Sequence, residues 1–220
     1  MNLKKPLVLV VCVLFIGLTV GISNKLASED ESTKKIELDY TNLESAVIEV
    51  LNEMPDSSVG IRPGGKGLTV AESKVKNAKA KDSLNKQKTK FRLKLESKLS
   101  NKNYSEKELD AMAEKSTNNL EQAIAIAESV YGVEVSQEEV TKYIDENVAV
   151  FVSEEKERYA KSLGLTTHEL DYTFDRDFYV IDTLWEKLIP VLMDKHPKNQ
   201  DEKDDEYLQR IKDEFYSHTK

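Results

Sequence analysis

Apolar residues recur at helical spacing along most of the chain after its N-terminal segment. Between residues 41 and 54 they lie three and four positions apart, and Pro55 follows directly. The same spacing returns in residues 105–131, 136–144, 153–163 and 166–190. Residues spaced in this way form one face of an amphipathic helix. The pattern therefore predicts an all-α domain over residues 41–198. Residues 199–220 are predicted to form a C-terminal amphipathic helix that docks on this domain.

Short capping motifs mark where several of these helices begin. The pattern Ser/Thr-x-x-Glu marks predicted helix starts at Thr41, Thr69, Ser105, Ser136 and Thr166. In such a box the hydroxyl and the carboxylate satisfy free amide groups of the first turn. Gly132 and Gly164 follow helical segments, where glycine is the favoured C-terminal residue. The pattern predicts a long helix that begins at Thr166, and Pro190 is expected to kink or end it.

The N-terminus has the layout of an export signal. Lys4 and Lys5 precede residues 7–22, a stretch without a charge, and a polar segment follows. This length falls between a signal-peptide core and the ~20 residues that span a bilayer comfortably. Residues 1–23 are thus predicted as a signal peptide or a signal anchor helix, and residues 24–40 as a polar spacer. The protein would then be a single-pass cell-membrane protein with its C-terminal part outside, or secreted if the signal is cleaved.

A strongly basic segment contrasts with the acidic remainder of the chain. Residues 74–98 hold nine lysines and one arginine against two acidic residues, while the whole chain carries a net charge of −8. We predict that this basic helix presents a solvated face, with contact to an anionic envelope surface as the alternative. Export argues against nucleic acid as a partner.

Groups that would indicate catalysis or metal binding are missing from the sequence patterns. The histidines are scattered at His168, His196 and His218, and the only cysteine, Cys12, lies inside the N-terminal apolar run; neither arrangement is typical of a metal site. Residues 60–66 have the spacing of a phosphate-binding loop, but Gly67 replaces its final Ser/Thr. Acidic residues cluster at Asp171, Asp175 and Asp177, which we interpret as solvated charges. No catalytic, metal-binding or cofactor-binding residue is predicted, so an enzyme is not expected.

Two motifs resemble the N-terminal chaperone domain of SurA/PrsA-type foldases. Residues 123–144 carry the elbow Gly-Val-Glu-Val-Ser followed by an acidic helix start, and residues 162–170 carry Leu-Gly-Leu-Thr-x-x-Glu. Residues 64–72 are more loosely similar to the turn before the family's first domain helix. The resemblance implies a cradle of helices, completed by a C-terminal helix, that holds unfolded exported proteins. The sequence after Leu192 is too short for the family's prolyl-isomerase domain, so that activity is not expected.

The resemblance and the export signal together predict an extracytoplasmic polypeptide-binding, chaperone-like module without catalytic activity. Its partners would be unfolded or partly folded exported polypeptides, and residues 7–22 would contact the membrane. The alternative is a membrane-anchored structural or regulatory protein that binds one specific envelope partner. Aromatic side chains are the candidate polypeptide contacts: Tyr143, Tyr172, Phe174, Phe178, Tyr179, Trp185, Tyr207 and Phe215. Aromatic residues at helical spacing also pack in cores, and this interpretation stays open.

Overall fold

The computed structural model describes residues 38–54, 59–62, 65–68 and 83–218. Regular structure in these ranges is helical, with only an isolated antiparallel bridge between Ile61 and Leu68, and this confirms the predicted all-α class. The predicted signal segment 1–23 and most of the predicted spacer 24–40 lie outside the described residues. Among the helices that are described, none combines the length and the apolar character needed to cross a membrane.

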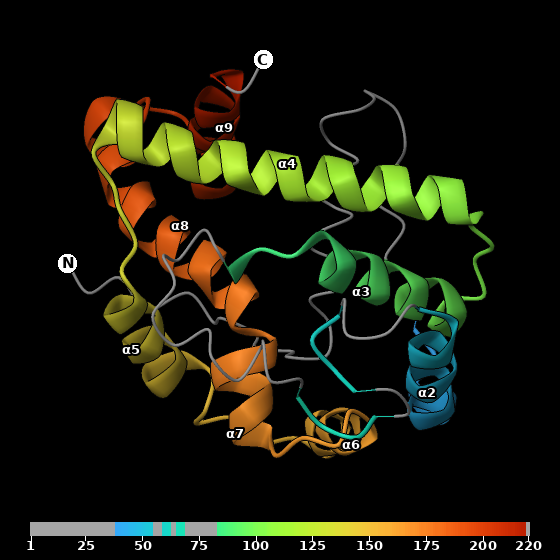
Figure 1. Ribbon diagram of the computed structural model, residues 1–220. Helices are drawn as coiled ribbons and strands as arrows, with labels where there is room; N and C mark the ends of the chain where they lie inside the picture. Colours follow the sequence, from blue (N-terminus) through green and yellow to red (C-terminus); the bar gives the residue numbers. More distant parts are fainter. Residues whose placement is uncertain (1–37, 55–58, 63–64, 69–82, 219–220) are drawn as a thin grey trace.

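Ten helical elements follow one another along the described chain. They are the 3-10 turn η1 (Tyr40–Asn42), α2 (Leu43–Glu53), α3 (Lys86–Leu99), α4 (Glu106–Tyr131), α5 (Gln137–Asn147), α6 (Glu154–Ser162), α7 (Thr167–Glu169), the π-turn η4 (Leu170–Phe174), α8 (Arg176–Lys195) and α9 (Asp204–Ser217). The long helix α4 lies across one side of the molecule, with α3 alongside it (Figure 1). Helix α8 runs from the C-terminal end of α4 toward α5 and α7, and α2 packs between α3 and α6.

Three of the predicted capping boxes form, and the one predicted at Thr69 lies outside the described residues. Each pairs a hydroxyl with the backbone amide and carboxylate three residues later, at Ser105, Ser136 and Thr166. The predicted box at Thr41 is wrong. There the Asp39 carboxylate accepts the Thr41 amide hydrogen at 2.9 Å and starts a 3-10 turn, and helix α2 then begins at Leu43, where Asn42 makes no side-chain cap. Asp39, two residues upstream, therefore accepts the Thr41 amide hydrogen that the motif assigned to Glu44.

The long helix predicted from Thr166 is interrupted. The Asp175 amide donates to the Leu170 carbonyl at 2.8 Å, five residues back, which inserts a π-turn between α7 and α8. Pro190 does not end α8, which continues to Lys195. A π-turn adds one residue to the helical register and so changes which side chains face the core. At this turn Asp171 and Asp175 become buried.

Two main hydrophobic cores hold the helices together. One joins α2, α3, α6 and η4 around Phe91, Leu163 and Phe174. The other joins the C-terminal half of α4 with α8 and α9, and it contains Ile211 and Phe215. Both of these α9 side chains are fully buried, and α9 packs within this core against α4 and α8. Burial of one such side chain contributes roughly 2 kcal/mol, which makes α9 an integral part of the fold.

A glycine-rich turn packs against the elbow between α6 and α7. The Gly67 amide donates to the Leu163 carbonyl at 3.0 Å. A Cβ on Gly164 would lie only 2.2 Å from the Gly65 carbonyl oxygen. Gly164 also has a φ of +70°, which L-residues with a side chain rarely adopt. Glycine at position 164 thus lets the two backbones touch.

Candidate functional site

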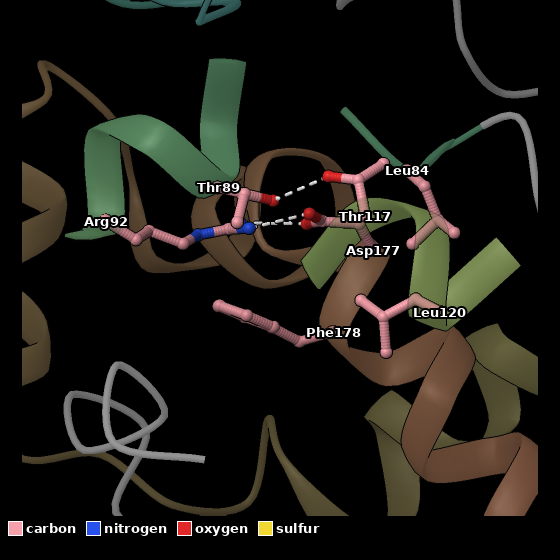
Figure 2. A pocket seen from close by; sticks show the side chains of 7 residues that line it. All are labelled: Leu84, Thr89, Arg92, Thr117, Leu120, Asp177 and Phe178. Carbon is pink, nitrogen blue, oxygen red and sulfur yellow. Dashed lines mark hydrogen bonds and ion pairs between the residues drawn. The ribbon is translucent and has the colours of Figure 1, made fainter. Parts of the chain in front are cut away.

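A buried cluster of charges joins α3 to the start of α8. The Arg92 guanidinium donates to both oxygens of Asp177 at 2.6 and 2.8 Å and to Asp175 at 2.9 Å, and Figure 2 shows it pointing at Asp177. All three residues are at most 4% exposed. The Phe178 ring covers the guanidinium at 3.7 Å, a distance at which the ring face attracts a cation. The prediction that the aspartates at 171, 175 and 177 are solvated is therefore wrong.

The cluster is electrically balanced within the protein. The buried Lys88 ammonium donates to the Phe174 carbonyl at 2.9 Å and lies close enough to stabilise both carboxylates. Burial raises the pKa of Asp175 to about 6, although Arg92 lowers it in part. Burial acts on Asp177 in the same direction, but Arg92 and Lys88 outweigh it and lower its pKa. The two pKa values shift in opposite directions because Asp177 accepts two hydrogen bonds from the guanidinium and Asp175 accepts one. Each such hydrogen bond favours the charged carboxylate.

A small cavity lies beside this cluster between α3, α4 and α8. It measures about 10 Å³, and the Thr89 and Thr117 hydroxyls face each other across 3.5 Å next to it (Figure 2). Its lining residues are Leu84, Thr89, Arg92, Thr117, Leu120, Asp177 and Phe178. This volume is about that of one water molecule. The charge cluster therefore stabilises the fold and has no space for a substrate beside it.

The described part of the basic segment is α3, and its cations point into the fold. Lys88, Arg92 and Lys94 are at most 6% exposed. The lysines nearer the surface bind acidic residues of α2 and α4: Lys90 lies 2.8 Å from Asp110, and Lys98 lies 2.7 Å from Glu49. The predicted solvated face is therefore wrong for α3, because neighbouring helices cover it on several sides. Residues 74–82 of the basic segment lie outside the described residues.

A second buried ion pair supports the loop between α5 and α6. The Lys156 ammonium lies 2.6 Å from Asp171, and both side chains are almost fully buried. The same ammonium donates to the Val148 carbonyl at 3.4 Å and to the Phe151 carbonyl at 3.2 Å. Burial raises the pKa of Asp171, while the charge and hydrogen bond of Lys156 oppose that change, as an opposite charge does for a buried carboxyl group. The Lys156 ammonium thus holds the backbone of residues 148–151 from the interior of the protein.

This loop exposes three consecutive apolar side chains, which we call the apolar loop. Val150, Phe151 and Val152 are 62%, 50% and 65% exposed, and the Phe151 amide closes the turn by donating to the Val148 carbonyl at 3.1 Å. Single exposed apolar residues are ordinary on protein surfaces, but adjacent ones on a fixed backbone indicate a contact site. This site was not predicted from the sequence. Its only local signal is the apolar run 148–152 between two polar helix ends.

The structure divides the eight predicted aromatic contacts into two groups. Four side chains are at most 4% exposed and pack in the cores: Phe174, Tyr179, Tyr207 and Phe215. In this conformation a polypeptide cannot reach them, because neighbouring helices cover them. Four others are partly buried, namely Tyr143, Tyr172, Phe178 and Trp185.

The partly buried aromatic residues do not form one surface. Trp185 packs on Phe215 at the α8–α9 contact, 5.3 Å between ring centroids, and Phe178 covers Arg92. Tyr143 on α5 and Tyr172 in η4 pack against the small core that α5 makes with α8, and this core includes Val148, just before the apolar loop. The Tyr172 hydroxyl donates to Asp145 near the end of α5. Tyr143 and Tyr172 are therefore the members of the predicted set nearest to an accessible apolar site.

The fold and the site define a small all-helical protein with a supported, exposed apolar loop. Within the described ranges, no group of three or more His, Cys, Asp or Glu residues is arranged to hold a metal ion. Comparison with known proteins finds no matching family model, no similar curated protein and no similar solved structure. The apolar loop can bind apolar side chains of another molecule by removing them from water.

Proposed function

We propose that this chain is an extracytoplasmic, SurA-like polypeptide-binding module that works without catalysis. The apolar loop is the observation that carries the proposal, since it offers Val150, Phe151 and Val152 to a partner on a prepared backbone. The sequence resemblance supports the same assignment. Its two motifs lie on either side of the loop, at the α4–α5 connection and at the α6–α7 connection.

The expected affinity for a single contact is modest. Burying the exposed parts of three apolar side chains yields on the order of 3 kcal/mol. Association costs at least as much in lost translational and rotational freedom. Tight binding therefore needs further contacts around the loop, and Tyr143 and Tyr172 are placed to add them. Weak, reversible capture of many segments suits a chaperone-like module.

A second function is favoured by one feature of the same loop. Because Lys156 binds two loop carbonyls and Asp171, the loop has a fixed shape. A fixed shape costs little entropy on binding and matches a preformed pocket. The alternative is therefore a membrane-anchored structural or regulatory protein that binds one specific folded envelope partner through this loop.

An aggregation assay on the full chain in lipid nanodiscs tests the proposal. A chemically unfolded test protein is diluted into buffer, and light scattering is followed with and without equimolar chain. We expect the wild type to delay aggregation and a variant with Val150→Ser, Phe151→Ser and Val152→Ser to lose most of the delay. The matched control replaces three other exposed apolar residues with serine: Val130, Met193 and Leu208. Circular dichroism verifies that both variants are folded.

The outcomes separate the two functions. If the wild type neither delays aggregation nor binds a permanently unfolded labelled polypeptide, the chaperone-like function is excluded. A single stoichiometric envelope partner, captured by the wild type and lost with the loop variant only, would establish the alternative. Equal loss in the loop variant and in the control variant would show that the apolar loop has no special role.

A further inference from the structure

Acidic side chains surround the apolar loop on both sides. Five of them are exposed, and we call them the acidic rim: Asp145, Glu146, Glu154, Glu155 and Glu157. The only cation between residues 145 and 157 is Lys156, which is buried and paired with Asp171. The chain on both sides of Val150, Phe151 and Val152 therefore carries a net negative charge at its exposed positions.

Cations of the described residues neutralise little of this charge. Glu146 has a weak partner in Lys142, 3.9 Å away on the exposed surface of α5. Arg158 follows the rim in sequence but pairs with Glu44 of α2. Within the described part of the chain, no cation lies within ion-pair distance of Glu154, Glu155 or Glu157. Exposed carboxylates of this kind remain available to a partner.

Helix stability accounts for only part of the rim. The three glutamates at the start of α6 lie in its first turn, where the helix dipole favours negative charge. Asp145 and Glu146 lie in the last turn of α5, where no basic residue compensates and the dipole disfavours negative charge. Asp145 accepts a hydrogen bond from Tyr172, but Glu146 has only its weak contact with Lys142. Of the two acids, Glu146 is therefore the one that folding explains least and that a cationic partner could pair with.

We infer that the apolar loop and its acidic rim bind a cationic apolar polypeptide segment, in which aliphatic or aromatic side chains alternate with lysine or arginine. The inference rests on the proposed function and names its ligand class. Apolar side chains of the segment cover Val150, Phe151 and Val152, while its cations lie against the rim carboxylates. Each exposed ion pair contributes at most about 1 kcal/mol, so the charges mainly select the ligand and speed its association.

The same charges disfavour a lipid surface as the occupant. An apolar tip on a membrane-tethered protein could enter a bilayer, but anionic headgroups would repel the five carboxylates placed beside it. A cationic polypeptide satisfies the apolar loop and the rim together. The interaction with lipid thus becomes an outcome that the experiment must be able to detect.

Peptide binding to the full chain in phosphatidylcholine nanodiscs tests the inference. Three labelled, unstructured peptides share the same leucine, valine and phenylalanine positions, and lysine, glutamine or glutamate fills the positions between them. Fluorescence anisotropy measures binding at low and high salt. We expect the lysine peptide to bind roughly tenfold more tightly than the glutamine peptide at low salt, and the glutamate peptide to bind most weakly. The preference should shrink several-fold at high salt because exposed charges are screened.

Two variants assign the effect to the site. The rim variant carries Glu146→Gln, Glu154→Gln, Glu155→Gln and Glu157→Gln. It should lose the preference for lysine and still bind the glutamine peptide. The control variant removes four exposed acids from α9 by Asp205→Asn, Glu206→Gln, Asp213→Asn and Glu214→Gln, and it should retain the preference.

Each failure has a distinct signature. Equal binding of the three peptides by the wild type overturns this inference and leaves the proposed function intact. A preference that the rim and control variants lose equally also overturns it, since net charge alone would then be responsible. Loop-dependent binding to phosphatidylglycerol vesicles without peptide binding overturns it in favour of a lipid surface. Binding of no peptide, together with no delay of aggregation, excludes the proposed function itself.

Discussion

Replacing Arg92 with methionine tests what the buried charge cluster contributes to stability. Methionine fills similar space but leaves Asp175 and Asp177 without the guanidinium that binds both. Removing one partner of a buried ion pair typically costs about 3–5 kcal/mol. We expect the lower part of this range, because Lys88 still stabilises the two carboxylates.

Urea denaturation, followed by circular dichroism and by the fluorescence of Trp185, measures this loss. Trp185 is the only tryptophan and reports on the contact between α8 and α9. Without Arg92 the pKa of both aspartates should rise, so that lowering the pH protonates them in the folded state. A carboxyl group whose pKa is higher in the folded state than in the unfolded state lowers the free energy of unfolding at any pH above its folded pKa. At a pH below its unfolded pKa it has no such effect, because it is then protonated in both states. The loss should therefore be larger at pH 8 than at pH 5.

Arg210→Met is the matched control. Arg210 on α9 binds Glu202, which precedes this helix, at 2.7 Å, and their side chains are 36% and 10% exposed. Breaking a partly exposed pair of this kind costs less than breaking a fully buried one, because water can still reach the remaining charge. If Arg92→Met costs no more than Arg210→Met, or if its cost does not depend on pH, then the cluster does not stabilise the fold as argued. Adding Asp177→Asn to the Arg92→Met variant should restore part of the loss, because it removes one uncompensated charge.

Three further substitutions test other parts of the structure. Glu96 is 1% exposed, has no hydrogen-bond partner for either carboxylate oxygen among the described residues, and burial raises its pKa to about 7. The free energy of unfolding of the wild type, measured by urea denaturation, should fall by about 2 kcal/mol as the pH rises from about 4.5 to about 7. Glu96→Gln should remove this pH dependence, and an unchanged pH dependence would refute the role given to Glu96. Gly164→Ala should lower stability by more than about 2 kcal/mol in thermal unfolding, because its Cβ would clash with a backbone carbonyl. Gly132 has a similar φ to Gly164, but no atom lies within 4 Å of a Cβ added there. Gly132→Ala should therefore lower stability by only about 1 kcal/mol. Phe215→Ala should cost about 3–5 kcal/mol and expose α9 to limited proteolysis, while the more exposed Leu208→Ala should not; equal cleavage would contradict docking by Phe215.

Local sequence was enough to predict most helices and their ends. The boxes at Ser105, Ser136 and Thr166 form because they involve groups three residues apart, which depend little on the rest of the fold. Gly132 ends α4 in a left-handed conformation for the same local reason. The box at Thr41 failed because Asp39 competes for the same amide.

The charged residues could not be placed from their local pattern. Asp175 and Asp177 look like solvated acids in the sequence, but the π-turn and the distant Arg92 bury them. The lysines of α3 look like a basic surface, and helices α2 and α4 supply the carboxylates that pair with them. Burial of a charge depends on a partner, and these partners lie on other helices.

The helical class and the start of most helices followed from the amino-acid order alone, because they depend on spacing and on short-range hydrogen bonds. Contacts between distant parts of the chain were needed to settle which polar residues are buried and which apolar ones are exposed. Residues 148–152 are an apolar run that could have entered the core. Instead the ammonium of Lys156, paired with Asp171, binds the loop carbonyls from inside and leaves Val150, Phe151 and Val152 at the surface.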